Sequence, residues 1–186
     1  ARVVHAQDPT QGVRLTLEYR PGARPGVLVL PVAGAHGDSI RAILERDLDF
    51  GNRVSIVTLP TADAASLTPR PGQPPNWPLL ARLGAAGVVQ VASTPTGVSV
   101  TVHDVGRQSV LDTQAFALRG APFSRDWRHA VHAMSDEIEG WLTGTRGIAR
   151  TRIAFVRGAA LYVVDSDGAM ETAIPVVSPP LSPAWH

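Results

Sequence analysis

The last 35 residues, 152–186, place short apolar stretches between turns, and this pattern limits what the chain can fold into. Arg152–Val156 and Leu161–Gly168 predict two β-strands, the second ending in an Asp/Gly turn, and Leu181–Trp185 predicts the start of a third. Such strands make about half of a four-stranded β-propeller blade. A propeller buries its faces by stacking several blades. The sequence therefore predicts one small domain followed by a truncated first propeller blade.

Residues 13–144 predict an α/β (α+β) two-layer domain, built on a mixed sheet with two to three helices. Strand-like stretches recur along it, some alternating apolar with polar residues and others continuously apolar. They are Val13–Tyr19, Val27–Val32, Val54–Leu59, Gly87–Ala92, Val98–Asp104 and Ser109–Leu118. Around this domain we predict an N-terminal arm at 1–12, a linker at 145–151 and the blade at 152–186.

The helices of this domain are predicted from apolar stripes with capping residues at their ends. Ile40, Ile43, Leu44 and Leu48 form one stripe, which Asp38 would cap and Gly51 would end. A short helix is predicted from Trp77 to Gly84, and a long one from its Ser124 cap to Gly144. Between the first two helices, Thr61–Pro78 predicts a long, mobile polar loop because it holds many prolines.

The composition excludes several functional classes. A formal net charge of only +1 argues against a nucleic-acid-binding surface. The chain has no lysine and no cysteine, which excludes a P-loop lysine, a Schiff-base lysine, thiol catalysis and disulfides. No apolar run reaches the roughly 18 residues that a membrane-spanning helix needs.

No motif in the sequence assigns a catalytic, cofactor-binding or metal-binding residue. The Gly-x-Ser-x-Gly elbow of serine hydrolases is absent. His129, His132 and Asp136 share one helix face and could hold zinc. The favoured interpretation is a solvated polar stripe in which His132 and Asp136 share a hydrogen bond. The sequence therefore predicts a protein that is not an enzyme and has no cofactor.

Three loops allow both a ligand-binding and a plain structural interpretation. Asp165–Gly168 resembles the start of a calcium loop, but the twelfth position is Val176, so a tight turn is favoured. Gly34–Gly37 precedes a helix, where anions can bind, yet it lacks the full glycine fingerprint and a plain β-to-α loop is favoured. Pro69–Pro78 could present a polyproline surface to a partner, although a linker lying over the domain is favoured.

The N-terminus contains a pattern typical of an export signal. Val4 and Ala6 stand at the −3 and −1 positions of a signal-peptidase site, which would make residues 1–6 a signal-peptide remnant and Gln7 the mature start. The alternative is a disordered terminus with an accidental pattern.

Several segments, in order along the chain, resemble the N-terminal part of the TolB family. The most specific ones are His132–Ile138 with Leu142–Gly144, followed by Gly147–Ile148 and Thr151–Val156. The others are Gly26–Pro31, Ile40–Asp47, Trp77 with Leu83–Val89, and Leu181–Trp185. The chain departs from the family at Gly87, where an Asp is usual, and in its proline-rich loop.

This resemblance implies a non-enzymatic adaptor of the Tol–Pal envelope system, located in the periplasm and monomeric. In the family, an N-terminal arm binds the C-terminal domain of TolA, while the propeller binds Pal and some colicins. It also implies roles in outer-membrane integrity, cell division and colicin import. In this chain the arm would be Gln7–Gly12, and the predicted partner-binding residues are Gln7, Asp8, Pro9, Thr10, Gln11, Gly12 and Val13. Pal binding would require a full propeller.

Two alternatives remain open from the sequence. TolB-like blades also precede hydrolase domains, so the chain could be the N-terminal region of a propeller-bearing peptidase. It could also be a free-standing envelope domain that binds another protein, in which residues 152–186 add strands to the sheet.

Overall fold

The computed structural model describes residues 24–70 and 73–184, which fold into two separate β-sheets and four helices. The strand predicted at Val13–Tyr19 lies outside the described residues. The first sheet has five strands in the order β2-β1-β3-β4-β5. The bounds of these strands are β1 (Gly26–Val29), β2 (Ser55–Ile56), β3 (Ala85–Thr94), β4 (Gly97–Asp104) and β5 (Ser109–Ala117).

The first sheet is mixed, as predicted. Strand β1 pairs in parallel with β2 and with β3, whereas β3, β4 and β5 pair antiparallel. Strand β1, which lies inside the sheet between β2 and β3, is apolar throughout because both of its faces are covered. Val27 and Val29 belong to one core cluster, and Leu28 and Leu30 to another.

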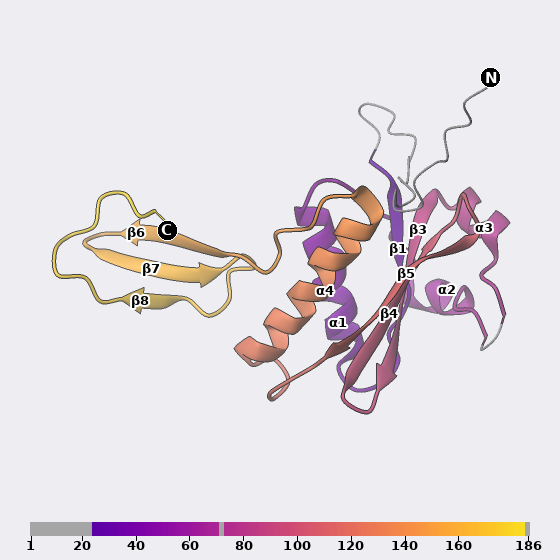
Figure 1. Ribbon diagram of the computed structural model, residues 1–186, viewed down its shortest axis with the longest axis horizontal. Coiled ribbons are helices and arrows are strands. Elements are labelled where there is room, and N and C mark those ends of the chain that lie inside the picture. The colour runs from indigo at the N-terminus through magenta and orange to yellow at the C-terminus, as the bar shows by residue number, and fades with distance from the viewer. Residues whose placement is uncertain (1–23, 71–72, 185–186) are drawn as a thin grey trace, which may run out of the picture.

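Helices cover the two faces of this sheet unequally (Figure 1). The two long helices, α1 (Gly37–Phe50) and α4 (Arg125–Thr143), pack on each other and on one face. The two short helices, α2 (Thr61–Ser66) and α3 (Trp77–Arg82), lie against part of the other face. The prediction of a continuous loop over Thr61–Pro78 was wrong, because Ala64 and Leu67 are buried and order the turn of helix that holds them.

The ends of the long helices agree with the sequence, with one exception. Ser124 caps α4 by accepting a hydrogen bond from the Trp127 amide, and Gly144 ends it with a left-handed φ of 75°. Helix α1 ends at Gly51 as predicted, but it begins at Gly37 and not behind an Asp38 cap. Its N-cap is His36, with a φ of 63° and no side-chain cap.

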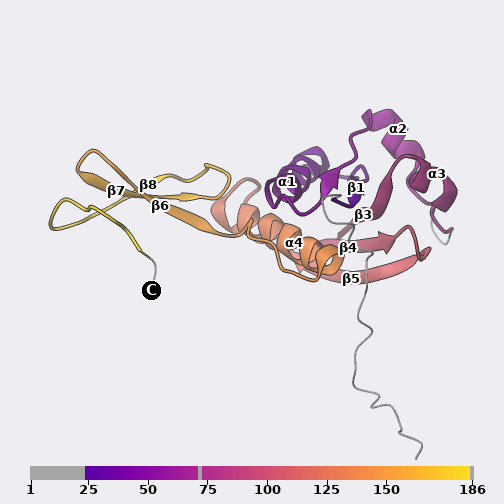
Figure 2. The ribbon, with the colours of Figure 1, turned by 90° about the horizontal axis from the view of Figure 1, so that it is seen from above.

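The second sheet is antiparallel and projects from the side of the first domain where α1 and α4 lie (Figure 2). It contains β6 (Arg152–Arg157), β7 (Ala160–Asp165) and β8 (Thr172–Ile174), in that order. The third strand is therefore Thr172–Ile174, and the prediction of a strand starting at Leu181 was wrong for the described residues. Pro179, Pro180 and Pro183 supply no amide hydrogens there, which disfavours strand pairing.

Candidate functional site

A histidine on helix α4 is among the most buried polar residues that the structure describes. His132 is 1% exposed and lies between helix α1 and the turn that follows β7. Its Nδ1 is 2.7 Å from Oδ2 of Asp47 on α1, and its Nε2 is 3.1 Å from Oδ2 of Asp167 in the turn. The prediction of a solvated stripe with a His132–Asp136 hydrogen bond was wrong, because α1 and the turn together cover this face of α4.

Two other side chains complete this contact. The Ser135 hydroxyl donates to Oδ2 of Asp47 at 2.7 Å, and Arg128 forms an ion pair with Asp167. Oδ1 of Asp167 accepts the Ala169 amide at 2.9 Å, which holds the carboxylate in place. We call Asp47, Arg128, His132, Ser135 and Asp167 the polar joint. It ties α1 and α4 of the first domain to the second sheet.

A second carboxylate of the same turn lies beside the polar joint. Asp165 is 1% exposed, and its carboxylate accepts no hydrogen bond from the residues that the structure describes. Its neighbours are His129, with Nε2 at 3.4 Å, and Arg125, with Nε at 4.0 Å. Gly168 donates its amide to the Asp165 carbonyl at 2.8 Å, which confirms the tight turn. The turn carboxylates thus face cationic or protonatable side chains of α4.

Asp136 binds the linker and not a histidine. Its Oδ1 accepts the Ala149 amide at 2.6 Å and its Oδ2 accepts the Arg150 amide at 3.2 Å. Burial raises the pKa of the Asp136 carboxyl, and these two amides partly counter the rise. The Asp136 carbonyl accepts the Gly147 amide at 3.0 Å, so the linker is hydrogen-bonded along α4.

Glu139, one turn further along α4, holds the start of the linker through an arginine. Nη1 of Arg53 is 3.3 Å from Oε1 of Glu139 and also donates to the carbonyls of Thr145 and Arg146, at 3.2 and 3.0 Å. Burial raises the pKa of the Glu139 carboxyl, while the charge on Arg53 lowers it. The second sheet is therefore anchored both by its own turn and by the linker that leads into it.

The other loops singled out by the sequence take structural roles. Gly34–Gly37 forms a plain β-to-α loop in which Gly37 donates its amide to the Gly34 carbonyl at 3.2 Å. In the proline-rich segment, Asn76 caps α3 and Trp77 packs against the core on the side of α2 and α3. Trp77 also lies 5.9 Å from the His103 ring, measured between ring centroids. This tryptophan is part of the domain and is not presented as a free recognition surface.

The polar joint is a network of ion pairs and hydrogen bonds. Over residues 24–70 and 73–184, no three His, Asp or Glu side chains are arranged to hold a metal ion. Both carboxylate oxygens of Asp167 already have partners, since Oδ2 contacts Arg128 and His132 and Oδ1 accepts the Ala169 amide. Within the same ranges, no helix combines the length and the apolar character needed to cross a bilayer.

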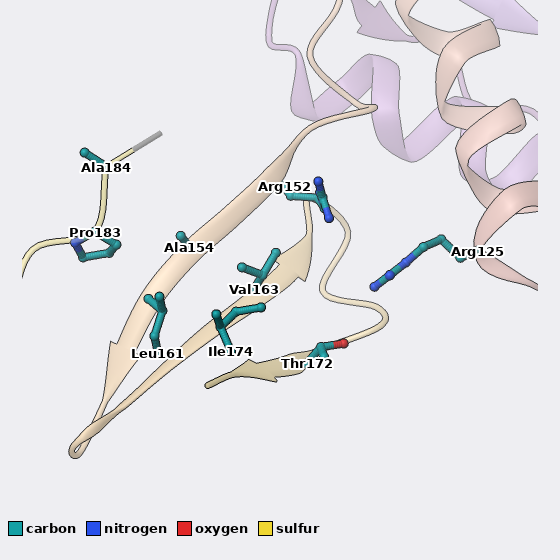
Figure 3. A pocket seen from close by; sticks show the side chains of 9 residues that line it. All are labelled: Arg125, Arg152, Ala154, Leu161, Val163, Thr172, Ile174, Pro183 and Ala184. Carbon is teal, nitrogen blue, oxygen red and sulfur yellow. The ribbon is translucent and has the colours of Figure 1, made fainter. Parts of the chain in front are cut away.

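One face of the second sheet is hollowed and apolar (Figure 3). The hollow has a volume of about 280 Å³, and Ala154, Leu161, Val163 and Ile174 line it. Arg125 extends from α4 toward one end of it (Figure 3). Propeller blades stack through apolar faces, and the assignment of residues 152–186 to such a blade stays a prediction.

Sequence reasoning missed most of the polar joint. Asp47 lies three residues after Leu44 and seven after Ile40, so its position on the apolar stripe of α1 was a signal of burial. Asp167 gave no such signal, because its partners lie on helices far away in the chain. The predicted arm residues, Gln7 to Val13, lie outside the described residues and stay a prediction.

The fold and its joint define a two-part protein: an α/β domain whose last helix carries a separate antiparallel sheet. No family model matches the chain. The Tol-Pal system protein TolB of Sodalis glossinidius is 32% identical to it, over 100% of this chain and 45% of that protein. TolB of Legionella pneumophila strain Philadelphia 1 is 30% identical, over 94% of this chain and 43% of that protein.

The structures agree with these sequence relationships. The crystal structure of TolB from Acinetobacter baumannii matches with a TM-score of 0.66 and 28% identity, covering 89% of this chain and 42% of that one. The chain belongs to the TolB family. It spans less than half the length of the curated relatives it matches.

Proposed function

We propose that the chain is the TolA-binding part of a non-enzymatic periplasmic adaptor in the Tol–Pal envelope system. The observation that carries this proposal is the 32% identity to a Tol-Pal system protein along the full chain. The non-enzymatic part of the proposal has a second support. The described polar side chains of the joint and the linker pair with one another, which is typical of a structural role. Roles in outer-membrane integrity, cell division and colicin import belong to the same proposal.

The proposed binding element is the N-terminal arm, residues 7–12, together with Val13. A peptide segment that binds in an extended conformation can add to the sheet edge of a partner through main-chain hydrogen bonds. The folded unit behind it would be the domain at 13–144, joined through 145–151 to the blade at 152–186. Pal is proposed as a partner only of a complete propeller, of which this blade would be one part.

The proposal is tested by titration calorimetry of the 186-residue chain with a TolA C-terminal domain. Deleting residues 7–12 removes several main-chain hydrogen bonds and should weaken binding more than tenfold, at about 1 kcal/mol for each bond. Deleting residues 1–6, a segment of equal length, is the matched control and should leave the affinity unchanged. Equal affinities for the two deletions would refute the arm assignment, and no binding by the intact chain would refute the TolA partner.

A further inference from the structure

The polar joint contains more hydrogen-bond acceptors than a neutral histidine can satisfy. Both ring nitrogens of His132 face carboxylate oxygens, those of Asp47 and Asp167. An ionised carboxylate only accepts hydrogen bonds, and a neutral imidazole has one N–H. Two hydrogen bonds at 2.7 and 3.1 Å therefore need one additional proton in the joint.

The charged groups around His132 favour placing that proton on its ring. The Asp47 and Asp167 side chains are 2% and 3% exposed, so both carboxylates have little contact with water. From the turn, Asp165 adds a third buried carboxylate close by. A protonated imidazole between two such carboxylates forms two charge-assisted hydrogen bonds, which are stronger than neutral ones.

The cationic or protonatable groups that face the carboxylates of the joint and the turn come from both helices. On α1, Nη1 of Arg46 lies 3.7 Å from Oδ1 of Asp47, but its side chain is 45% exposed and water weakens the interaction. On α4, Arg128 pairs with Asp167, while Arg125 and His129 face Asp165. Arg46 also reaches from α1 to the turn, where it donates to the Ser166 carbonyl at 3.4 Å. None of these groups lies between Asp47 and Asp167, so among the described residues His132 is the side chain that joins the two carboxylates.

We propose that His132 is a proton-dependent latch that fixes the second sheet to the first domain. With the ring protonated, His132 donates to Asp47 and to Asp167 together and connects α1, α4 and the turn. When the pH rises, the proton leaves for solvent and one carboxylate loses its hydrogen bond from His132. It keeps its other partners, Ser135 for Asp47 or Arg128 and the Ala169 amide for Asp167. The turn at Asp165–Gly168 then opens more often, which frees the second sheet to reorient. This inference rests on the geometry of the joint and not on the proposed binding of TolA.

The experiment combines two measurements on the full chain between pH 5 and pH 8. This window lies above the pH at which ordinary carboxylates take up protons, roughly pH 4. Nitrogen-15 NMR of the His132 side chain reports whether both ring nitrogens carry a hydrogen atom. Amide hydrogen exchange at residues 165–169, corrected for its intrinsic pH dependence, reports how often the turn opens.

The latch predicts that both ring nitrogens are protonated at pH 5 and that the turn opens about tenfold more often at pH 8, as expected for the loss of one charged hydrogen bond. His132→Gln should remove the pH dependence of the turn. His103→Gln, on strand β4 and outside both the polar joint and the turn, should retain it. If His132→Gln does not fold, the two measurements on the native chain between pH 5 and pH 8 still test the proposal. A single ring N–H at every pH, or turn exchange independent of pH, would overturn the proposal.

Discussion

The two faces of helix α4 make different kinds of buried contact. The face toward the first sheet is apolar, with Val131, Met134 and Ile138 fully buried in the core. The face toward α1, the linker and the second sheet is polar but almost as well buried, with His132 and Glu139 only 1% and 2% exposed. One helix thus builds a domain on one side and a joint on the other.

The two faces of α4 should respond differently when a side chain is substituted. Apolar burial is non-directional and scales with area, so a shortened side chain leaves a cavity and a graded loss of stability. A buried ionic contact depends on every partner, because removing one leaves another desolvated without compensation. The core therefore determines whether the domain folds, and the joint determines where the second sheet sits relative to it.

The largest loss of stability is expected from a substitution in the apolar core between the long helices and the first sheet. Leu44 of α1 is fully buried in the core that α1, α4 and the first sheet share. Leu44→Ala should lower the free energy of unfolding by about 3 kcal/mol, the sum of lost burial and a new cavity. Urea denaturation followed by circular dichroism measures this. Phe50→Ala, at the exposed end of the same helix, is the control and should change stability by about 0.5 kcal/mol or less.

If Leu44→Ala lowered the free energy of unfolding by less than about 1 kcal/mol, the contrast between the apolar and polar faces would be wrong. That result would mean that the apolar side of α1 contributes no more than a surface position, and that the polar side holds the helices together.

The next largest loss of stability is expected where the linker lies close against α4. A Cβ atom at Gly147 would lie 2.7 Å from Oε2 of Glu139 and 2.8 Å from Cα of Asp136, which leaves no room for a methyl group. Gly147→Ala should therefore destabilise the protein by about 2 kcal/mol and expose the linker to protease. Thermal unfolding and limited trypsin digestion at Arg146 and Arg150 measure the two effects.

Gly140 provides the matched control for this substitution. It lies inside α4, and a Cβ there would be 3.5 Å from the nearest atom, Cα of Arg146, an ordinary contact. Gly140→Ala should raise stability by about 0.5 to 1 kcal/mol, because alanine favours the helix over the unfolded chain. If both variants behaved alike, the linker would not be packed on α4 as the structure describes.

The same contrast explains which features could be predicted from sequence. The apolar stripe of α4 and its caps, Ser124 and Gly144, are local patterns with fixed spacing, and they were confirmed. Strands β3 to β5 followed equally from local patterns, a continuous apolar run for β3 and an alternating strand joined by a turn to its partner for β4 and β5. The mixed α/β fold class could therefore be predicted from short stretches of sequence read one at a time.

The polar joint could not be predicted, because its parts are far apart in the chain. Asp47 meets His132 across 85 residues, and Asp167 meets it across 35. His132 looked exposed because its helix face is polar, and nothing local shows that α1 and a turn cover it. The strand predicted at Leu181 failed for a related reason, since Thr172–Ile174 is ordered by its pairing with β7 and not by a long apolar pattern.

The smallest expected effect is a pH dependence of stability from the polar side of α4. Burial raises the pKa of the Glu139 carboxyl above its ordinary value of 4.5, and Arg53 counters only part of the rise. The folded protein therefore binds this proton more tightly than the unfolded chain. The resulting stability is present below the unfolded pKa and is lost as the pH rises through the folded pKa. Burial raises the pKa of Asp136 as well, so its contribution has the same sign.

Glu139→Gln removes one of these titrating groups while keeping the size of the side chain. Between pH 4 and pH 7 the variant should therefore lose less stability than the native chain, by about 1 kcal/mol or less. Urea denaturation at several pH values measures both slopes. Asp63→Asn, at an exposed position of α2 outside the joint and the linker, should leave the native slope unchanged. A variant at 139 that loses more stability than the native chain would show that the Arg53 ion pair outweighs burial. The polar face of α4 would then be stabilised by its charges in the way that its other face is stabilised by apolar packing.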